Sequence, residues 1–409
     1  MRVAVDFQDE RVDLDVPDEA LVGSWHGPRG RGADEVPALI AEALEHPREF
    51  PSLRQALVPG DRVVIALGDD VPEAPAVLGS VYRVLENAGI EPGGVVVLTG
   101  PQPRAKLADA VPAEVTFLKH DPDDPNNLAY LAATTGERRV YLNRALTDAD
   151  FVLPVGRLGY DPALGYEGPW GVIFPGLSDQ KTRAEFRANA TGEPPDPLHP
   201  KPALTESAEV SWLLGIQFQV GVVAGVSGVV GAVAGLGSAV LEHGAREVDR
   251  AWVFRADSRA ELVVAGIGRP GASTGIDDVA RGLSTAVQLV RRGGKIVILS
   301  RAAGPISPTV RRLINAGDPH ADTLEDCDEN DGENASGKDD DSTARMILRA
   351  VEWADVYLLS GFSADDVEEL SIIPLERPEE AGRLAKLSDS CLVLSQADLA
   401  RAEVADEPN

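Results

Sequence analysis

The sequence predicts an α/β protein with two α/β domains and a cleft between them. Short, continuously apolar segments alternate with amphipathic helical segments along most of the chain. Continuous apolar strands separated by helices are typical of parallel sheets that are covered on both faces. The chain has 409 residues, of which 44% are hydrophobic and 25% charged, which is enough for two or three globular domains.

The first domain is expected over residues 1–200. RVVIAL (62–67) and VVVLTG (95–100) predict buried strands. The segment between them, from Ala76 to Ala88, predicts a helix that ends at Gly89. Further strands are predicted in EVTFL, RVYL and FVLPVG, at 114–118, 139–142 and 151–156. The proline-rich segment 192–202 can form neither a helix nor a central strand, so we expect it to connect the domains.

The second domain is expected over residues 203–409. The uncharged stretch 213–241 is long enough to span a membrane, but its seven glycines favour two β segments joined by a turn, followed by a helix. Later strands are predicted at 249–254, 260–266, 293–300, 355–361 and 391–395, with helices at 277–292, 342–354 and 363–370. This order of strands and helices again predicts a parallel sheet.

The net charge of −28 excludes several classes of partner. Nucleic acids and anionic membranes both require a basic surface, so we expect neither. The segment 322–341 contains ten acidic residues and one base, Lys338, and predicts a solvated, mobile loop. It departs from the calcium-loop pattern because Asp331 precedes Gly332 and Lys338 stands where the last glutamate belongs. A basic protein partner for this loop stays an open alternative.

Few other motifs point to chemistry. Two cysteines, Cys327 and Cys391, can form neither a disulfide framework nor a thiolate cluster, and no two histidines have the spacing of a helical metal pair. We therefore expect no protein metal site of these kinds. The charged N-terminus does not resemble a secretory signal, so a cytoplasmic location is expected.

Three glycines, Gly266, Gly268 and Gly271, follow a predicted strand with the spacing G-x-G-x-x-G. This spacing is found where a dinucleotide pyrophosphate meets the start of a helix. Pro270 delays the next helix to about Ile276, and no acidic residue lies near position 291 to hold a ribose. These two departures argue against dinucleotide binding.

Several segments resemble the lactate racemase family. The similarity lies in residues 35–75 and 118–158, in the Pro-Gly turn of IFPGLSDQKT (173–182), and more weakly in VVGAVAGLGSAVLEHG, VVAGIGRPGA and RRGGKIVILSRAAGP. These segments occur in the family's order and span about residues 30 to 310. The resemblance implies a two-domain α/β protein whose site lies in the interdomain cleft.

The resemblance also implies a reaction and a cofactor. Members of this family racemise or epimerise small 2-hydroxy acids. They use a nickel-pincer nucleotide that is tethered to a lysine and whose nickel is also bound by a histidine. Two further histidines act as general bases, and hydride moves between the substrate α-carbon and the pyridinium ring.

The cofactor-binding motifs of the family are only partly kept. Its phosphate-loop motif D-x-T-R-P-x-P corresponds to residues 69–75, where Asp69 matches the aspartate and Pro72 replaces the arginine. Proline can neither pair with a phosphate nor donate a backbone hydrogen bond. The motif T-G-T-H becomes Thr99-Gly100-Pro101-Gln102, which implies cofactor contacts from Thr99 and Gly100. Gln102 stands at a catalytic histidine and cannot take up a proton at neutral pH.

The second base and the substrate contact also change. The second catalytic histidine falls near Tyr160 or Asp161, and Asp161 can act as a base only with a pKa above its ordinary value of about 3.9. The family's substrate-side polar residues correspond to Asp278 and Arg281. Arg281 can clamp a carboxylate with two hydrogen bonds, and the alternative is an exposed helix face.

The tether and the nickel ligand have no direct counterpart. The loop that carries the family's lysine is Gly168-Pro169-Trp170-Gly171-Val172 here. The nickel-binding histidine falls near Arg187. Lys181 and His199 are the nearest possible substitutes, although both also fit a solvated surface position.

Three hypotheses follow. In the first, the chain is a divergent lactate racemase-like protein that keeps the scaffold, has lost the nickel nucleotide, and binds or converts another small molecule, such as a small carboxylate. In the second, it is an active 2-hydroxy acid racemase or epimerase that keeps the nickel-pincer nucleotide. In the third, it is an acidic interaction protein. The sequence leaves the oligomeric state open.

Overall fold

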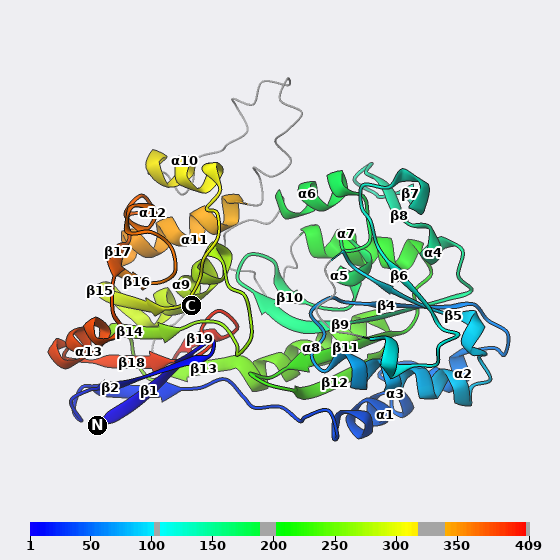
Figure 1. Cartoon of the computed structure of the whole chain (residues 1–409), viewed down its shortest axis with the longest axis horizontal. Helices are drawn as coiled ribbons and strands as arrows, with labels where there is room; N and C mark the ends of the chain where they lie inside the picture. The colour runs from blue at the N-terminus through cyan, green and yellow to red at the C-terminus, as the bar shows by residue number, and fades with distance from the viewer. Residues whose placement is uncertain (102–106, 189–201, 318–339, 406–409) are drawn as a thin grey trace.

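The computed structural model describes residues 1–101, 107–188, 202–317 and 340–405. It is a mixed α/β structure built on two sheets that lie side by side and are both covered by helices (Figure 1). This confirms the predicted fold class. Within the described residues, no helix is both long and apolar enough to cross a bilayer.

The first sheet has seven strands in the order β12-β11-β9-β4-β5-β6, with β10 paired to β9. All neighbours on this path are parallel except β11 and β12. The strands are β4 (Val63–Leu67), β5 (Val95–Thr99), β6 (Thr116–Lys119), β9 (Phe151–Asp161), β10 (Gly165–Glu167), β11 (Gln219–Ala224) and β12 (Val229–Gly235).

The second sheet has six strands in the order β17-β16-β15-β14-β18-β3, and every neighbouring pair is parallel. The strands are β3 (Leu21–Trp25), β14 (Ala260–Gly266), β15 (Val290–Leu299), β16 (Asp355–Leu359), β17 (Ile373–Leu375) and β18 (Cys391–Leu394). Three two-stranded pairs complete the β structure: β1 (Arg2–Phe7) with β2 (Glu10–Asp15), β7 (Leu128–Ala133) with β8 (Arg139–Asn143), and β13 (Val253–Ala256) with β19 (Arg401–Val404).

Helices cover both faces of the first sheet. Apolar side chains of α1 (Val36–Glu45) and α3 (Ala74–Asn87) pack on one face, and those of α6 (Gln180–Ala188) and α7 (Pro202–Leu213) pack on the other. The remaining helices of this half are α2 (Leu53–Ala56), α4 (Arg144–Thr147), α5 (Trp170–Ile173) and α8 (Gly237–Trp252). Strand β4 is buried along its whole length, as its continuous apolar sequence predicts.

The second sheet alternates its side chains between two cores. Val263 packs with α9 (Ile276–Leu289) and α11 (Asp340–Trp353), whereas its neighbours Leu262 and Val264 pack with the β1–β2 hairpin and α13 (Pro378–Leu387). This alternation follows from the two-residue period of a strand. The remaining helices are α10 (Pro308–Ala316) and α12 (Ala364–Glu368).

The two sheets do not divide the chain at the boundary expected near residue 200. Strand β3, close to the N-terminus, is the edge strand of the second sheet, and β11 and β12 belong to the first sheet (Figure 1). The sequence signals the existence of a strand but not its partner, because pairing depends on contacts distant in sequence. RVYL forms the predicted strand as β8, which lies in the separate β7–β8 hairpin. One finer prediction was wrong, because residues 249–252 continue α8 instead of forming a strand. The predicted connection 192–202 lies almost entirely outside the described residues.

Candidate functional site

A cavity of about 310 Å³ lies at the carboxyl ends of the central strands of the first sheet. The chain runs from β4 to β5 and β6 on one side, whereas β9 and β11 lie on the other side of β4. Ligands of parallel α/β sheets bind at such a change of direction, outside the carboxyl ends of the strands. Asp69 and Asp70 follow β4, Gly100 follows β5, and Arg157 lies on β9, and all four line the cavity.

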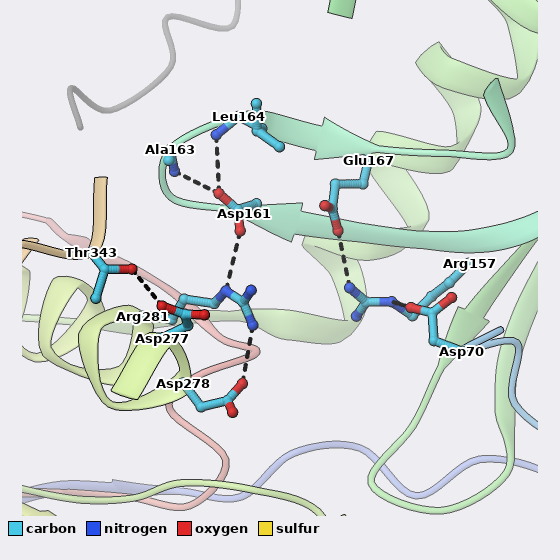
Figure 2. Close-up of polar contacts among 10 residues, drawn as sticks. All are labelled: Asp70, Arg157, Asp161, Ala163, Leu164, Glu167, Asp277, Asp278, Arg281 and Thr343. Atoms are coloured by element: carbon cyan, nitrogen blue, oxygen red, sulfur yellow. Dashed lines mark hydrogen bonds and ion pairs between the residues drawn. The ribbon is translucent and has the colours of Figure 1, made fainter. Parts of the chain in front are cut away.

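Arg157 spans the cavity between two carboxylates. Its Nε donates to Asp70 Oδ2 at 2.7 Å, and its Nη2 donates to Glu167 Oε2 at 3.0 Å (Figure 2). Burial acts to lower the pKa of Arg157, but the two carboxylates outweigh it and raise the pKa, so the guanidinium stays charged. Burial also raises the pKa of Glu167, against the attraction of Arg157. The side chains of Asp70, Arg157 and Glu167 therefore form a half-buried cluster of charged groups, called here the charged floor of the cavity.

Apolar residues form the opposite part of the cavity. Leu164, Trp170, Leu177 and Phe186 line it, and Trp170 is buried. The short helix α5 places Trp170 there, and the loop Gly168–Val172 lies along the wall. A second arginine, Arg183 of α6, also lines the cavity and donates from Nη1 to Gly176 O at 3.1 Å. The cavity thus combines an apolar wall with polar groups, as small-molecule sites do.

Asp161 and Arg281 lie together next to this site. Arg281 Nε donates to Asp161 Oδ2 at 3.2 Å, and its Nη1 donates to Asp278 Oδ1 at 3.1 Å (Figure 2). Asp161 Oδ1 accepts the backbone N–H groups of Ala163 and Leu164, at 2.8 and 3.0 Å. Burial acts to lower the pKa of Arg281, but Asp161 and Asp278 outweigh it and raise the pKa. In this arrangement Asp161 closes the β9–β10 turn and binds a cation from the other half.

The predicted cofactor-binding residues lie in different places. Asp69 and Gly100 line the cavity, and a Cβ atom on Gly100 would lie 2.4 Å from Asp69 Oδ2, so the two residues are in close contact. Thr99 is buried at the end of β5. Lys181 lies on α6 with a side chain that is 84% exposed, pairs with Glu185, and does not line the cavity.

Two predicted residues are not fully described. Gln102, the predicted replacement for a catalytic histidine, lies outside the described residues. Arg187 lies on α6, but its side chain is outside the described part of the structure. Neither residue can be placed relative to the cavity.

The residue on which the charged floor depends was missed by the sequence analysis. Arg157 follows the apolar run FVLPVG within the same strand. A charged residue near the carboxyl end of a buried parallel strand is a signal for such a site. Glu167 carries no comparable signal, because the return of β10 along β9 brings it to Arg157.

His120 and two amides of the glycine motif contact other groups of the same chain. His120 is buried away from the cavity, where Ser178 O lies 2.8 Å from its Nε2 and Asn143 Nδ2 lies 3.2 Å from its Nδ1. No group of three potential metal-binding side chains occurs among the described residues. In the glycine motif, Gly268 N donates to Asp398 and Gly271 N donates to Asp9. Carboxylates of the same chain thus already bind two of the amides that a pyrophosphate would use.

The fold and the cavity define a class of protein: a two-sheet α/β protein with a cavity at the carboxyl ends of the strands of the first sheet. Residues 7–193 match the family model described as the lactate racemase N-terminal domain. No curated protein sequence matches the chain.

Two solved structures have a similar fold. The lactate racemase apoprotein from Thermoanaerobacterium thermosaccharolyticum matches with a TM-score of 0.75 at 16% identity, covering 98% of this chain and 100% of that one. A Thermotoga maritima protein matches with a TM-score of 0.60 at 13% identity, covering 93% of this chain and 100% of that one. The domain match shows that residues 7–193 are similar to the lactate racemase N-terminal domain, and the two solved structures show that the whole chain shares their fold.

Proposed function

We propose that this protein binds a small organic molecule in the cavity of the first sheet and uses no lysine-tethered nickel-pincer nucleotide. The observation that carries the proposal is the composition of the cavity wall. Where the resemblance places the tethering lysine, the wall consists of Gly168, Trp170, Gly171 and Val172. None of these residues has an amine that can hold the cofactor.

The described residues do not fit the family cofactor in other respects. No lysine or histidine is among the described residues that line the cavity. The nearest candidate tether, Lys181, is exposed and pairs with Glu185. At the position of the phosphate-binding arginine stands Pro72, which offers no cation. The proposal therefore assigns no reaction step to nickel, and whether the protein converts its ligand is left to experiment.

The ligand is proposed to carry a carboxylate. Arg157 and Arg183 both line the cavity, and the two carboxylates nearest Arg157 are already bonded to it. A carboxylate can pair with a guanidinium through two hydrogen bonds. The apolar wall of Leu164, Trp170 and Phe186 would contact the rest of the molecule. A small 2-hydroxy acid or a related carboxylate has this combination of groups.

Two measurements test the cofactor. The protein is purified from cells that make the nickel-pincer nucleotide, and its intact mass and nickel content are determined. We expect the mass of the unmodified chain and no stoichiometric nickel, together with no interconversion of D- and L-lactate. An added nucleotide mass with bound nickel would instead establish the active-racemase hypothesis.

A binding measurement tests the cavity. We expect small carboxylates, including D- and L-lactate, to release heat on titration into the protein. Arg183→Gln should weaken that binding by about tenfold or more, which corresponds to about 1.4 kcal/mol. Arg250→Gln is the matched control, because Arg250 lies exposed on α8 and, among the described residues, forms its ion pair with Glu247. Equal affinities for both variants would refute a ligand carboxylate at Arg183.

The interaction hypothesis rests on the acidic segment 322–341. Residues 318–339 lie outside the described structure, so this segment contributes no structural argument. The charge of the chain is its sole support.

A further inference from the structure

A second cavity, of about 600 Å³, lies at the carboxyl edge of the second sheet and shares no residue with the first. The chain continues from β14 to β15 on one side, and β18 and β3 lie on the other side. Pro270 follows β14, Gln396 follows β18 and His26 follows β3, and all three line the cavity. The second sheet therefore has a cavity at its own change of strand direction, the place where parallel α/β sheets bind ligands.

Two further segments complete the walls. The β1–β2 turn contributes residues 8–10, and the turn between β11 and β12 contributes Val226 and Ser227. Strands β11 and β12 belong to the first sheet, so both halves of the molecule build this cavity. Figure 1 shows the β1–β2 hairpin lying across β14 and β18.

Gln396 presents an unused hydrogen-bond donor to the cavity. The residue is 2% exposed. Its φ is 56°, a backbone conformation that residues other than glycine rarely adopt. Its Oε1 accepts the backbone N–H of Gly27 at 3.3 Å. Its Nε2 has no hydrogen-bond partner among the described residues. Because Gln396 lines the cavity, this amide N–H is available to an acceptor group of a ligand.

Two charged side chains of opposite sign are also available in this cavity. The Asp6 carboxylate lies 3.8 Å from Arg11 Nη1 and 3.7 Å from His26 Nδ1, and both distances exceed a hydrogen bond. Arg29 lines the cavity without an ion pair or hydrogen bond from its side chain to any described residue.

The other carboxylates at the cavity are already engaged. Asp9 accepts the N–H of Gly271 at 3.0 Å, and Glu10 accepts two hydrogen bonds from Arg301 at 2.6 and 2.9 Å. The groups left for a ligand thus include the Asp6 carboxylate, the guanidinium groups of Arg11 and Arg29, and the Gln396 amide N–H.

We propose that this cavity binds a free L-α-amino acid. The ligand carboxylate would accept hydrogen bonds from Arg29 and Gln396 Nε2, and its ammonium would pair with the Asp6 carboxylate. A zwitterion satisfies both signs at once and carries no net charge, so the −28 charge of the chain does not oppose its approach. A ligand with a carboxylate but no amine would give Asp6 no new partner. A ligand with an amine but no carboxylate would give Arg29 none.

The test begins with calorimetric titration of the coded L-α-amino acids, each at about 10 mM, into the full-length protein. The tightest binder is then compared with two analogues of the same carbon skeleton, one lacking the amine and one lacking the carboxylate. We expect the amino acid to bind at least about tenfold more tightly than either analogue.

Five variants locate the binding. Arg29→Gln and Asp6→Asn should each weaken it by about tenfold or more. Arg31→Gln and Asp15→Asn are the matched controls, because both residues lie nearby in sequence but do not line the cavity. Arg183→Gln alters the first cavity, so it should leave this binding unchanged.

The proposal is overturned if no amino acid binds the wild-type protein. It is also overturned if the analogue without an amine binds as tightly as the amino acid, since the site would then recognise only an anion. Unchanged affinity in both Arg29→Gln and Asp6→Asn would place the binding elsewhere.

Discussion

The Asp161 carboxylate and the Arg281 guanidinium, 3.2 Å apart, join the two halves of the molecule. Asp161 ends β9 of the first sheet, and Arg281 lies on α9, which packs on the second sheet. Asp161 also accepts two backbone N–H groups of the β9–β10 turn, and β10 carries Glu167 at the first cavity. The ion pair therefore fixes a turn of the candidate site against the opposite half.

Removing the cation should destabilise the protein. Arg281→Met leaves Asp161, whose side chain is only 13% exposed, without its charged partner. Because an unpaired, largely buried carboxylate is costly, we expect a loss of about 1–3 kcal/mol in the free energy of unfolding, measured with urea. Arg246→Met is the control, since Arg246 forms an exposed pair with Glu242 on α8 and should cost less than about 0.5 kcal/mol. Equal losses would show that the Asp161 pair is no stronger than a surface pair.

Two glycines beside the first cavity should respond oppositely to alanine. A Cβ atom on Gly176 would lie 2.4 Å from Val172 O and 2.8 Å from Gly171 O, and these backbone atoms cannot turn away. Gly176→Ala should therefore cost about 1–3 kcal/mol of stability.

The second glycine provides the matched control. Gly171 lies in α5 with no atom within 4 Å of an added Cβ, so Gly171→Ala should be neutral or stabilising by up to about 1 kcal/mol. Both variants are compared by urea unfolding. Equal stability of the two variants would contradict the packing around Gly176.

Asp398 should make stability depend on pH. The pKa of this carboxyl group is raised to about 6, mainly by burial and in smaller part by Asp278, against the lowering effects of the hydrogen bond from Gly268 N and the charge of Arg281. The unfolded chain has the ordinary pKa of about 3.9, so between these two values the folded protein binds more protons than the unfolded one. The contribution of Asp398 to stability is therefore complete below about pH 4 and is lost as pH rises through about 6.

The variant Asp398→Asn tests this dependence. It keeps a side-chain oxygen that can accept from Gly268 N but cannot ionise. Its free energy of unfolding, relative to wild type, should rise by roughly 3 kcal/mol between about pH 4 and 7 and then level off. Asp389→Asn, at an exposed position, controls for the loss of one negative charge. A relative stability that falls with rising pH would contradict the argument.

Much of the fold follows from local patterns in the sequence. The apolar runs of β4, β5, β14 and β16 lie within the predicted segments because a strand covered on both faces needs apolar residues on both faces. The helix expected from about Ile276 begins there as α9. The strand β3 was missed because LVGSW is short and only partly buried, so its sequence lacks a continuous apolar run.

The candidate site was predicted less completely. Asp69 and Gly100, which were singled out by similarity to a known motif, line the same cavity, and their role in binding a cofactor stays a prediction. Lys181 shares the same stretch of sequence as the cavity-lining Arg183, yet it points to the solvent because positions two apart on a helix lie on different faces.

Most of the strands and helices, the acidic character and the likeness to lactate racemase could be read from the sequence, because each depends on residue type and on spacing within one segment. Only the tertiary structure decided that β3 joins the second sheet, that Arg157 lies between Asp70 and Glu167, and that Arg281 binds Asp161. Asp161 and Arg281 are separated by 120 positions in the chain. Contacts of that kind form only when whole elements pack, so no local pattern encodes them.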